Sequence, residues 1–178
     1  VYTIRVVSKS AAIKTTEFTK EFTVTVVSKP FTSAATPPNR QASDVISIYS
    51  SKYADVATDY FPYWSQNQVG YGAKEFDLNG DKMLNYIKLS YQGMQLKDDK
   101  TINVSGMEFI HMDVWTSDVQ KIATSLISKT SGEKPVTKNL VANQWTSIDI
   151  PVSAFTSQGL TVADIWQFKF EATPSAVG

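Results

Sequence analysis

The segment between Met107 and Thr116 holds the side chains of this sequence that are best suited to bind a ligand. Its residues alternate in type. Ile110, Met112 and Val114 are apolar, and in an extended strand they would point to one side. The other side would carry Phe109, His111, Asp113 and Trp115, which include the only histidine of the chain. This period of two predicts a β-strand with an apolar face on a core and an imidazole, a carboxylate and an indole on its other face.

An aromatic ring beside planar polar groups is the chemistry of a carbohydrate-binding surface. Sugars present both hydroxyl groups and apolar C–H faces, so their sites combine stacking platforms with hydrogen-bonding side chains on rigid elements. We expect Trp115 to be the main platform and Trp64 to be a second one. His111 and Asp113 would supply hydrogen bonds beside Trp115. The alternative is that Trp115 and His111 are half-buried and bonded only to neighbouring side chains.

Two further predicted strands carry polar residues on one face. The strand over residues 83–92 would display Tyr86 and Lys88, and the last strand would display Gln167 and Lys169. We expect these polar faces to line one concave surface, which would form a glycan groove. The predicted ligand-binding residues are therefore Trp115, His111, Asp113, Trp64, Tyr86, Lys88, Gln167 and Lys169.

The segment from Asp77 to Asp81, Asp-Leu-Asn-Gly-Asp, has the composition of a calcium-binding loop but not its spacing. Its glycine is the fourth residue instead of the sixth, and the twelfth position holds Lys88 instead of glutamate. An Asn-Gly pair between two strands is better explained as a β-hairpin turn. We therefore predict no metal ion or other cofactor at this loop.

One pair of carboxylates is the main feature of the sequence that could indicate a catalytic function. Asp113 and Glu171 would lie on neighbouring strands, and glycosidases use two carboxylates. Acidic residues on a sugar-binding face also serve as simple hydrogen-bond acceptors, however, and the sequence has neither a nucleophile elbow nor a phosphate loop. A catalytic serine with the single histidine stays open, although no motif marks a nucleophile. We therefore predict a protein that is not an enzyme.

Composition argues against several classes of protein. The 178 residues contain 17 basic and 17 acidic side chains without a basic stripe, so nucleic acid is not an expected partner. No apolar run approaches the roughly 18 residues that a membrane-spanning helix needs. Cysteine is absent and histidine occurs once, which excludes disulfides, thiolate zinc sites and histidine-rich metal sites. The abundance of β-branched and aromatic residues favours an all-β protein.

Short alternating segments separated by glycine, proline and asparagine turns predict a β-sandwich. We expect strands at 44–50, 69–76, 83–92, 107–116, 119–129, 144–152 and 165–171, with a single helical turn within 153–160. The sandwich domain would span residues 44–178, after a proline-containing linker at 29–43 and a β-hairpin at 1–28. Trp145 and Trp166 are expected in the core, because their strands would bury that face.

The hairpin at the start of the chain resembles the closing strands of an Ig-like module of the PKD (polycystic-kidney-disease) type. Val1-Tyr-Thr-Ile-Arg-Val is similar to one of these strands, and Phe22-Thr-Val-Thr-Val-Val is similar to the final one. The resemblance implies that residues 1–28 are the end of a preceding domain. The alternative is a hairpin that belongs to the main fold, because two strands do not form an independent core.

Residues 44–171 resemble the jelly-roll carbohydrate-binding modules of Bacteroidetes. The segment Asn143-Gln-Trp-Thr-Ser-Ile-Asp-Ile-Pro-Val-Ser-Ala-Phe155 is similar to the W-x-x-v-x-I-P-L-S-x-F stretch of these modules. Further similar segments occur in the expected order: Asp44–Tyr53 followed by Trp64, then Tyr86–Gly93, Phe109–Trp115 and Gln167–Phe170. Such modules are attached to laminarinase-type glycoside hydrolases and also occur beside PKD-like domains in surface glycan-binding proteins.

This resemblance implies non-catalytic binding of a polysaccharide, with a β-glucan such as laminarin as the ligand. It also implies a secreted or outer-membrane location, neighbouring domains in a longer chain, and a structural calcium ion at an unspecified position. The closing strand of the family, Thr-Val-x-x-Asp-Asn-x-x-Phe, has no counterpart before Gly178, so we expect a fragment of a longer protein. The rival interpretation is a structural spacer or adhesion domain of a cell-surface protein without a sugar site.

Overall fold

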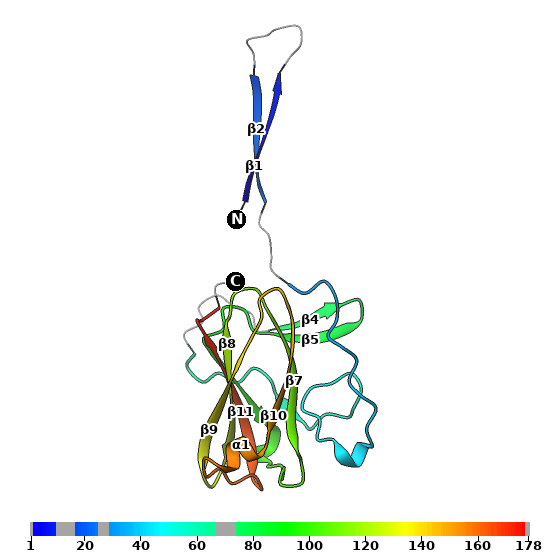
Figure 1. Cartoon of the computed structure of the whole chain (residues 1–178), viewed down its shortest axis with the longest axis vertical. Helices are drawn as coiled ribbons and strands as arrows, with labels where there is room; N and C mark the ends of the chain where they lie inside the picture. Colours follow the sequence, from blue (N-terminus) through cyan, green and yellow to red (C-terminus); the bar gives the residue numbers. More distant parts are fainter. Residues whose placement is uncertain (1, 10–16, 25–28, 67–73, 177–178) are drawn as a thin grey trace.

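The computed structural model describes residues 2–9, 17–24, 29–66 and 74–176, and the chain is all-β, as its composition predicted (Figure 1). The helical elements of these residues are α1 (Ser153–Thr156) and two 3-10 turns, Ala42–Asp44 and Lys97–Asp99. The helical turn predicted within 153–160 is therefore confirmed. No helix in the described part of the chain is long and apolar enough to cross a membrane.

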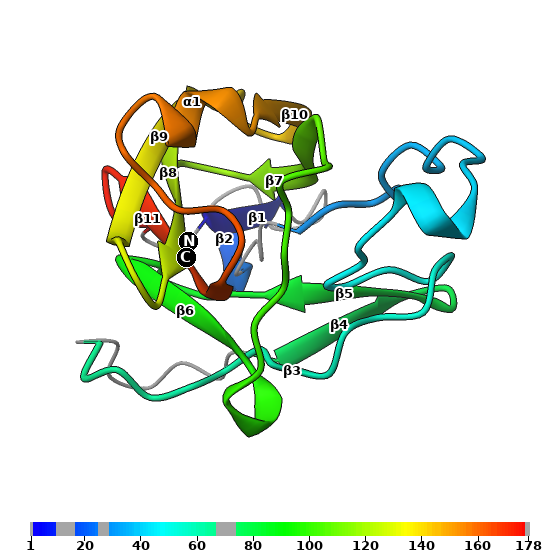
Figure 2. The same cartoon turned by 90° about the horizontal axis from the view of Figure 1, so that it is seen from below.

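Two layers of antiparallel strands form a β-sandwich, which confirms the predicted fold class. In spatial order, the five strands of the larger layer are β3 (Thr58–Asp59), β6 (Tyr91–Leu96), β11 (Ile165–Thr173), β8 (Lys121–Ser128) and β9 (Gly132–Asn139). The smaller layer pairs β7 (Phe109–Thr116) with β10 (Gln144–Pro151). Figure 2 shows β7 and β10 side by side, facing β6 across the interior.

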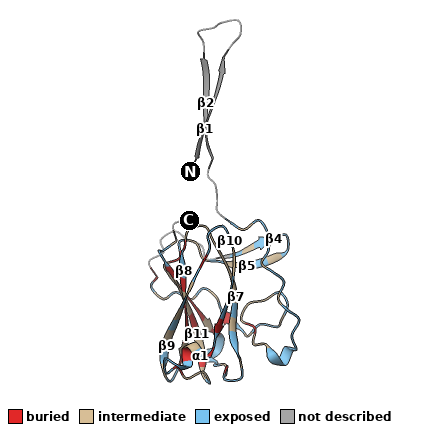
Figure 3. Ribbon diagram, viewed as in Figure 1, coloured by how far each residue is buried: buried red, intermediate tan, exposed pale blue. Residues whose placement is uncertain are grey.

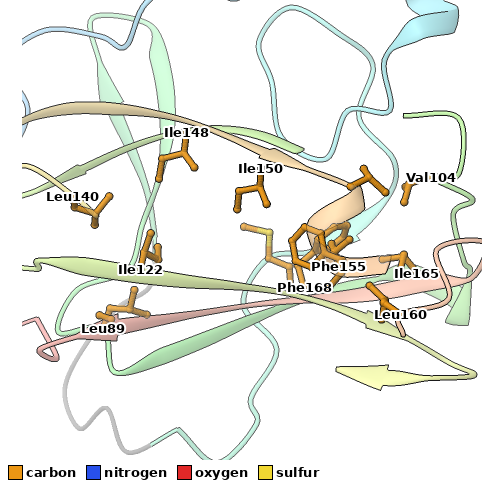
Figure 4. Close-up of a cluster of buried hydrophobic side chains, with 14 of the residues drawn as sticks. Leu89, Val104, Ile122, Leu140, Ile148, Ile150, Phe155, Leu160, Ile165 and Phe168 are labelled. Carbon is orange, nitrogen blue, oxygen red and sulfur yellow. The ribbon is translucent and has the colours of Figure 1, made fainter. Parts of the chain in front are cut away.

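The core lies between these two layers. Each strand contributes alternate residues to it, because successive side chains point to opposite faces of a sheet. Ile148 and Ile150 of β10 lie opposite Ile122 and Phe168 of the larger layer, and all four are buried (Figure 4). Phe155 of α1 is fully buried beside Phe168. Buried residues make up most of β6 and β8, and Figure 3 shows further buried residues in β11 and α1.

A small hairpin of β4 (Lys74–Leu78) and β5 (Asp81–Asn85) forms a separate two-stranded sheet. Asn79 and Gly80 join the strands, and their φ values of 56° and 93° suit the type I′ turn that asparagine and glycine favour. The Asp77 carboxylate accepts a hydrogen bond from the Gly80 N–H at 2.8 Å. The hairpin turn predicted from the Asn-Gly pair is therefore confirmed.

A second hairpin, of β1 (Tyr2–Lys9) and β2 (Glu17–Val24), precedes the sandwich in the chain. The two strands form one antiparallel ladder, and within the described residues neither pairs with any other strand. Figure 1 shows this hairpin apart from the other sheets. Its origin in an Ig-like domain stays a prediction.

The predicted linker at residues 29–43 is attached to the sandwich. The Trp145 indole N–H donates a hydrogen bond to the Thr32 carbonyl at 2.7 Å. The Tyr53 hydroxyl donates to the Pro38 carbonyl at 2.8 Å. An extended, proline-containing backbone leaves its carbonyl groups available as acceptors. The segment therefore runs along the sandwich surface, held by side chains from two distant parts of the sequence.

The prediction of a strand at residues 44–50 is wrong. This segment makes a single isolated bridge, between Ser47 and Asp55. The Asp55 carboxylate accepts hydrogen bonds from the Ser47 hydroxyl and from the Ser50 N–H. Such side-chain hydrogen bonds satisfy groups that would otherwise continue a β-ladder, so the segment remains irregular.

The prediction of a single strand at residues 83–92 is also wrong. β5 ends at Asn85 and β6 begins at Tyr91. Between them, Lys88 has a φ of 54°, a left-handed conformation that interrupts a strand. The strand predicted at 69–76 lies mostly outside the described residues, and its last part belongs to β4.

Candidate functional site

The predicted ligand-binding residues are distributed over two opposite outer faces of the sandwich. Because the core-facing residues of each strand point inward, their alternate neighbours point away from the core on opposite sides. We name the outer side of the larger sheet the five-strand face; it includes Tyr91, Gly93, Gln95, Ser125, Glu133, Gln167, Lys169 and Glu171. We name the outer side of the smaller sheet the two-strand face; it comprises Phe109, His111, Asp113, Trp115, Trp145, Ser147, Asp149 and Pro151. The prediction of one common concave surface is therefore wrong.

Trp64 lies against the five-strand face at Gly93. A Cβ atom at position 93 would be 2.2 Å from Cζ3 of the Trp64 ring, so the absence of a side chain there allows the close approach. The Tyr91 hydroxyl donates a hydrogen bond to the Trp64 carbonyl at 2.7 Å, and the Gln66 side chain accepts one from the Trp64 N–H. A loop residue is thereby fixed to the middle of strand β6.

Lys169, which pairs with Gly93 in the ladder, is held between two carboxylates. Its Nζ atom is 2.8 Å from Glu133 and 3.0 Å from Glu171. The fully buried Ser125 donates its hydroxyl to Glu133 at 2.7 Å. Burial alone would raise the pKa of Glu133, but the hydrogen bonds from Lys169 and Ser125 outweigh it and lower this pKa. The cluster therefore holds a carboxylate and an ammonium that are both charged at neutral pH.

Two amides extend this cluster toward the edge strand β3. The Gln167 amide N–H donates to the Gln95 side-chain oxygen at 2.9 Å. Gln95 also lines an open depression, together with Asp59, Leu96, Lys97, Asp98 and Asp99. Amide side chains carry two donors and an acceptor with two lone pairs, so one mutual bond leaves capacity for a ligand. The five-strand face thus offers donors and acceptors on the same sheet surface as an indole ring.

Four cross-strand pairs build the two-strand face. The register of β7 and β10 places Trp115 opposite Trp145, Asp113 opposite Ser147, His111 opposite Asp149, and Phe109 opposite Pro151. Aromatic rings therefore lie at one end of the face, polar groups in its middle and an apolar pair at its other end. Trp115 and Trp145 are half-buried, and Phe109 is 51% exposed.

His111 lies between two carboxylates in the polar middle of this face. Its Nδ1 atom is 2.8 Å from Asp149 Oδ1 and its Nε2 atom is 3.5 Å from Asp113 Oδ2. The imidazole side chain is nevertheless 44% exposed. Carboxylates on both sides fix the plane of the ring while solvent still reaches it. Trp115 is half-buried, as the alternative interpretation of the sequence expected, whereas His111 is more accessible than that alternative expected.

The prediction that Trp145 and Trp166 lie in the core is wrong. Trp145 is on the two-strand face, opposite Trp115. Trp166 is half-buried beside a β-bulge, and Lys129 Nζ lies 5.4 Å from its ring centroid. A bulge inserts one extra residue and breaks the period of two, so the alternation of β11 does not assign Trp166 to a face.

Tyr86 and Lys88 belong to neither face. The Tyr86 hydroxyl donates to the Tyr60 carbonyl at 2.9 Å, and its ring lies 5.9 Å from that of Phe61. Burial is the main cause of a raised pKa for Tyr86. Lys88 is exposed in the turn that separates β5 from β6. The prediction that both residues share a polar face with the last strand is wrong because the strand at 83–92 is interrupted.

Sequence reasoning missed several residues of the two faces, among them Gln95, Glu133, Trp145 and Asp149. Trp145 and Asp149 had a usable signal, because Ile148 and Ile150 are apolar and the residues that alternate with them must point outward. Glu133 had no such signal, since its contact with Lys169 depends on the order of the strands in the sheet.

The geometry also bears on catalysis and metal binding. Asp113 lies on the two-strand face and Glu171 on the five-strand face, so these carboxylates do not flank one bond, and the pairing considered from the sequence is wrong. Among the described residues, no group of three histidine or acidic side chains is placed to hold a metal ion. What both faces do provide is an aromatic ring on the same surface as hydrogen-bonding groups.

Comparison of the chain with protein-family models, with curated proteins and with solved structures gives no match. The resemblance to carbohydrate-binding modules of Bacteroidetes therefore stays a prediction from the sequence.

Proposed function

We propose that this protein binds a polysaccharide without cleaving it, and that the five-strand face is the binding surface. The observation that carries the proposal is the seating of Trp64 on Gly93, on the same sheet surface as Lys169, Gln167 and Gln95. A tryptophan ring supplies an apolar surface for the C–H face of a sugar. The ammonium and amide groups supply donors and acceptors for its hydroxyls.

The rigidity of this face supports binding. Lys169 is only 19% exposed and bonds two carboxylates, so its side chain is already ordered before a ligand arrives. Ordering a long side chain at an interface costs about 0.5–1.5 kcal/mol, and a group that is fixed in advance avoids that cost. Trp64 is fixed in the same way by Tyr91 and Gly93.

The openness of the face indicates a polymer as the ligand. Small molecules bind in pockets that enclose most of their surface. The depression beside Gln95 is open, and the cluster around Lys169 lies on the outside of a sheet. A long chain can lie across such a surface and gather contacts from several strands. A neutral chain suits it best, because Glu133 and Glu171 flank the Lys169 ammonium.

The wider features of the proposal rest on the sequence resemblance. They are a jelly-roll connectivity, a β-glucan such as laminarin as the ligand, a secreted or outer-membrane location in Bacteroidetes, and neighbouring domains that include a PKD-like one. The rival function is a spacer, and the attachment of residues 29–43 through Trp145 is the observation that favours it. A fixed connection between domains is what a spacer requires.

Affinity electrophoresis tests the proposal. The wild-type chain and its Trp64→Ala variant are run through gels that contain laminarin, mixed-linkage β-glucan, xylan or mannan. We expect one glycan to retard the wild type and the loss of Trp64 to weaken that retardation. A folded wild-type chain that no glycan retards would support the spacer. Retardation that Trp64→Ala leaves unchanged would keep the function and move its site away from the five-strand face.

A further inference from the structure

We infer that the two-strand face is a second, independent polysaccharide-binding site, so that one sandwich domain holds two glycan chains on opposite sides. This inference rests on the proposed function, because it assigns the same class of ligand to a different surface. It gives a role to residues that the five-strand face leaves without one. These are the histidine, the two aspartates and the aromatic side chains of β7; Trp145 of β10 lies on the same face and also holds residue Thr32 of the linker.

The exposed groups of the two-strand face match a neutral polyol. The side chains of His111 and Asp149 are 44% and 65% exposed, so both present polar atoms to a ligand. A sugar hydroxyl both donates and accepts hydrogen bonds, so it can donate to a carboxylate and accept from the imidazole N–H. An anionic polymer would be repelled by Asp113 and Asp149. An apolar protein surface would have to bury the polar rows without compensating hydrogen bonds.

The length of the face suits a chain with several sugar units. Six residue steps separate Phe109 from Trp115, which corresponds to about 20 Å along a strand. Apolar groups lie at both ends of that distance, as the pairs Trp115–Trp145 and Phe109–Pro151. Polar rows fill the interval between them. A flexible polymer with apolar and hydroxyl-bearing surfaces can meet each part of this pattern in turn.

The two sites do not compete for residues or for space. The layers of a sandwich are about 10 Å apart, and the core fills that distance. No residue of the two-strand face belongs to the five-strand face, because side chains on the two outer surfaces point in opposite directions. A chain bound on either side thus leaves the other accessible, and long polymers would be cross-linked by a single domain.

Isothermal titration calorimetry measures the number of sites per chain. The probe is laminarihexaose, or the corresponding hexasaccharide of the glycan that electrophoresis selects. We expect about two molecules bound per wild-type chain, and about one in each of the single-site variants, Trp64→Ala and Trp115→Ala. The stoichiometry is counted per chain, so it does not depend on whether the protein self-associates.

A second variant keeps the test valid if Trp115→Ala fails to fold. The double substitution His111→Gln with Asp149→Asn changes exposed polar groups without opening the core, and it should also reduce the stoichiometry to about one. A stoichiometry of one in the wild type that only Trp64→Ala abolishes would overturn this inference and leave the proposed function intact. A wild-type chain that binds no glycan would overturn both. Mixing the wild type with the long polysaccharide should produce turbidity, because two sites cross-link the polymer. No single-site variant should produce it.

Discussion

The five-strand face draws its side chains from four strands and a loop, whereas the two-strand face draws them from a single antiparallel pair. In the first, Trp64 and Gly93 are distant in the sequence, and Lys169 meets Glu133 across β8. In the second, one register fixes Trp115 against Trp145 and His111 against Asp149. The first surface therefore depends on tertiary packing, and the second depends on local pairing. Substitutions should therefore affect the two faces differently.

The largest effect should come from the core that both faces share. Phe155 is fully buried, and its replacement by alanine should reduce the free energy of unfolding by about 3–5 kcal/mol. Because the core joins both layers, the variant should lose order on both faces in one transition. Denaturation followed by tryptophan fluorescence and by circular dichroism measures this. Phe109→Ala is the matched control, because Phe109 is 51% exposed and its loss should change stability by less than about 1 kcal/mol. Transitions that differ between the two probes would contradict a shared core.

The second-largest effect should come from a substitution that impairs the five-strand face and leaves the two-strand face intact. In Gly93→Ala, the added methyl group would lie 2.2 Å from the Trp64 ring, so the ring must move, and the free energy of unfolding should fall by about 1–3 kcal/mol. Binding at the five-strand face should be lost, while the imidazole NMR signals of His111 should stay unchanged. Gly106→Ala is the control, because no described atom lies within 4 Å of the added position. Unchanged binding in Gly93→Ala would show that Trp64 is not a platform.

A smaller effect should appear at the edge of the two-strand face. Trp145→Phe keeps an aromatic ring but removes the indole donor that binds the Thr32 carbonyl at 2.7 Å. One such hydrogen bond contributes about 0.5–1.5 kcal/mol, so global stability should change little. Limited proteolysis between residues 29 and 43 should become faster, because the segment loses an attachment. Cleavage at the wild-type rate would mean that this hydrogen bond does not hold the segment in solution.

The smallest effect should be a pH dependence of the five-strand face. Lys169 and Ser125 lower the pKa of Glu133 despite its partial burial. A carboxyl group with a lowered folded-state pKa stabilises the protein above its unfolded pKa, which is near 4.5, and loses that contribution as the pH falls through its folded value. Urea denaturation between neutral and strongly acid pH measures it. Glu133→Gln should be slightly less stable than wild type at neutral pH and equal to it in acid. A difference between the two proteins that is constant with pH would contradict this ion pair.

Alternation alone identified much of the fold and one of the faces. Ile110, Met112 and Val114 were expected on a core and do pack against it, which fixes the outward direction of His111 and Trp115. The all-β class and the Asn-Gly hairpin likewise follow from local preferences, because β-branched residues favour strands and this turn requires positive φ values.

Interruptions of the strands were not visible in the sequence. The residues from 83 to 92 alternate in type, yet the backbone turns at Lys88, and Tyr86 packs beside Tyr60 and Phe61. Residues 44–50 also alternate, yet Asp55 satisfies their polar groups through its side chain. Period-two patterns describe where side chains would point in a strand, but competing side-chain hydrogen bonds and tertiary contacts decide whether the strand forms.

The alternation of residue types is enough to show which residues of each strand share a side, because the period of a β-strand is a local property of the backbone. Which strands become neighbours, in contrast, depends on tertiary packing. That order placed Lys169 beside Glu133 and Glu171, brought Trp64 onto Gly93, and directed Trp115 and Lys169 to opposite sides of one core. Contacts of this kind join residues that are far apart in the chain, and their formation depends on how the two layers bury their apolar surfaces together.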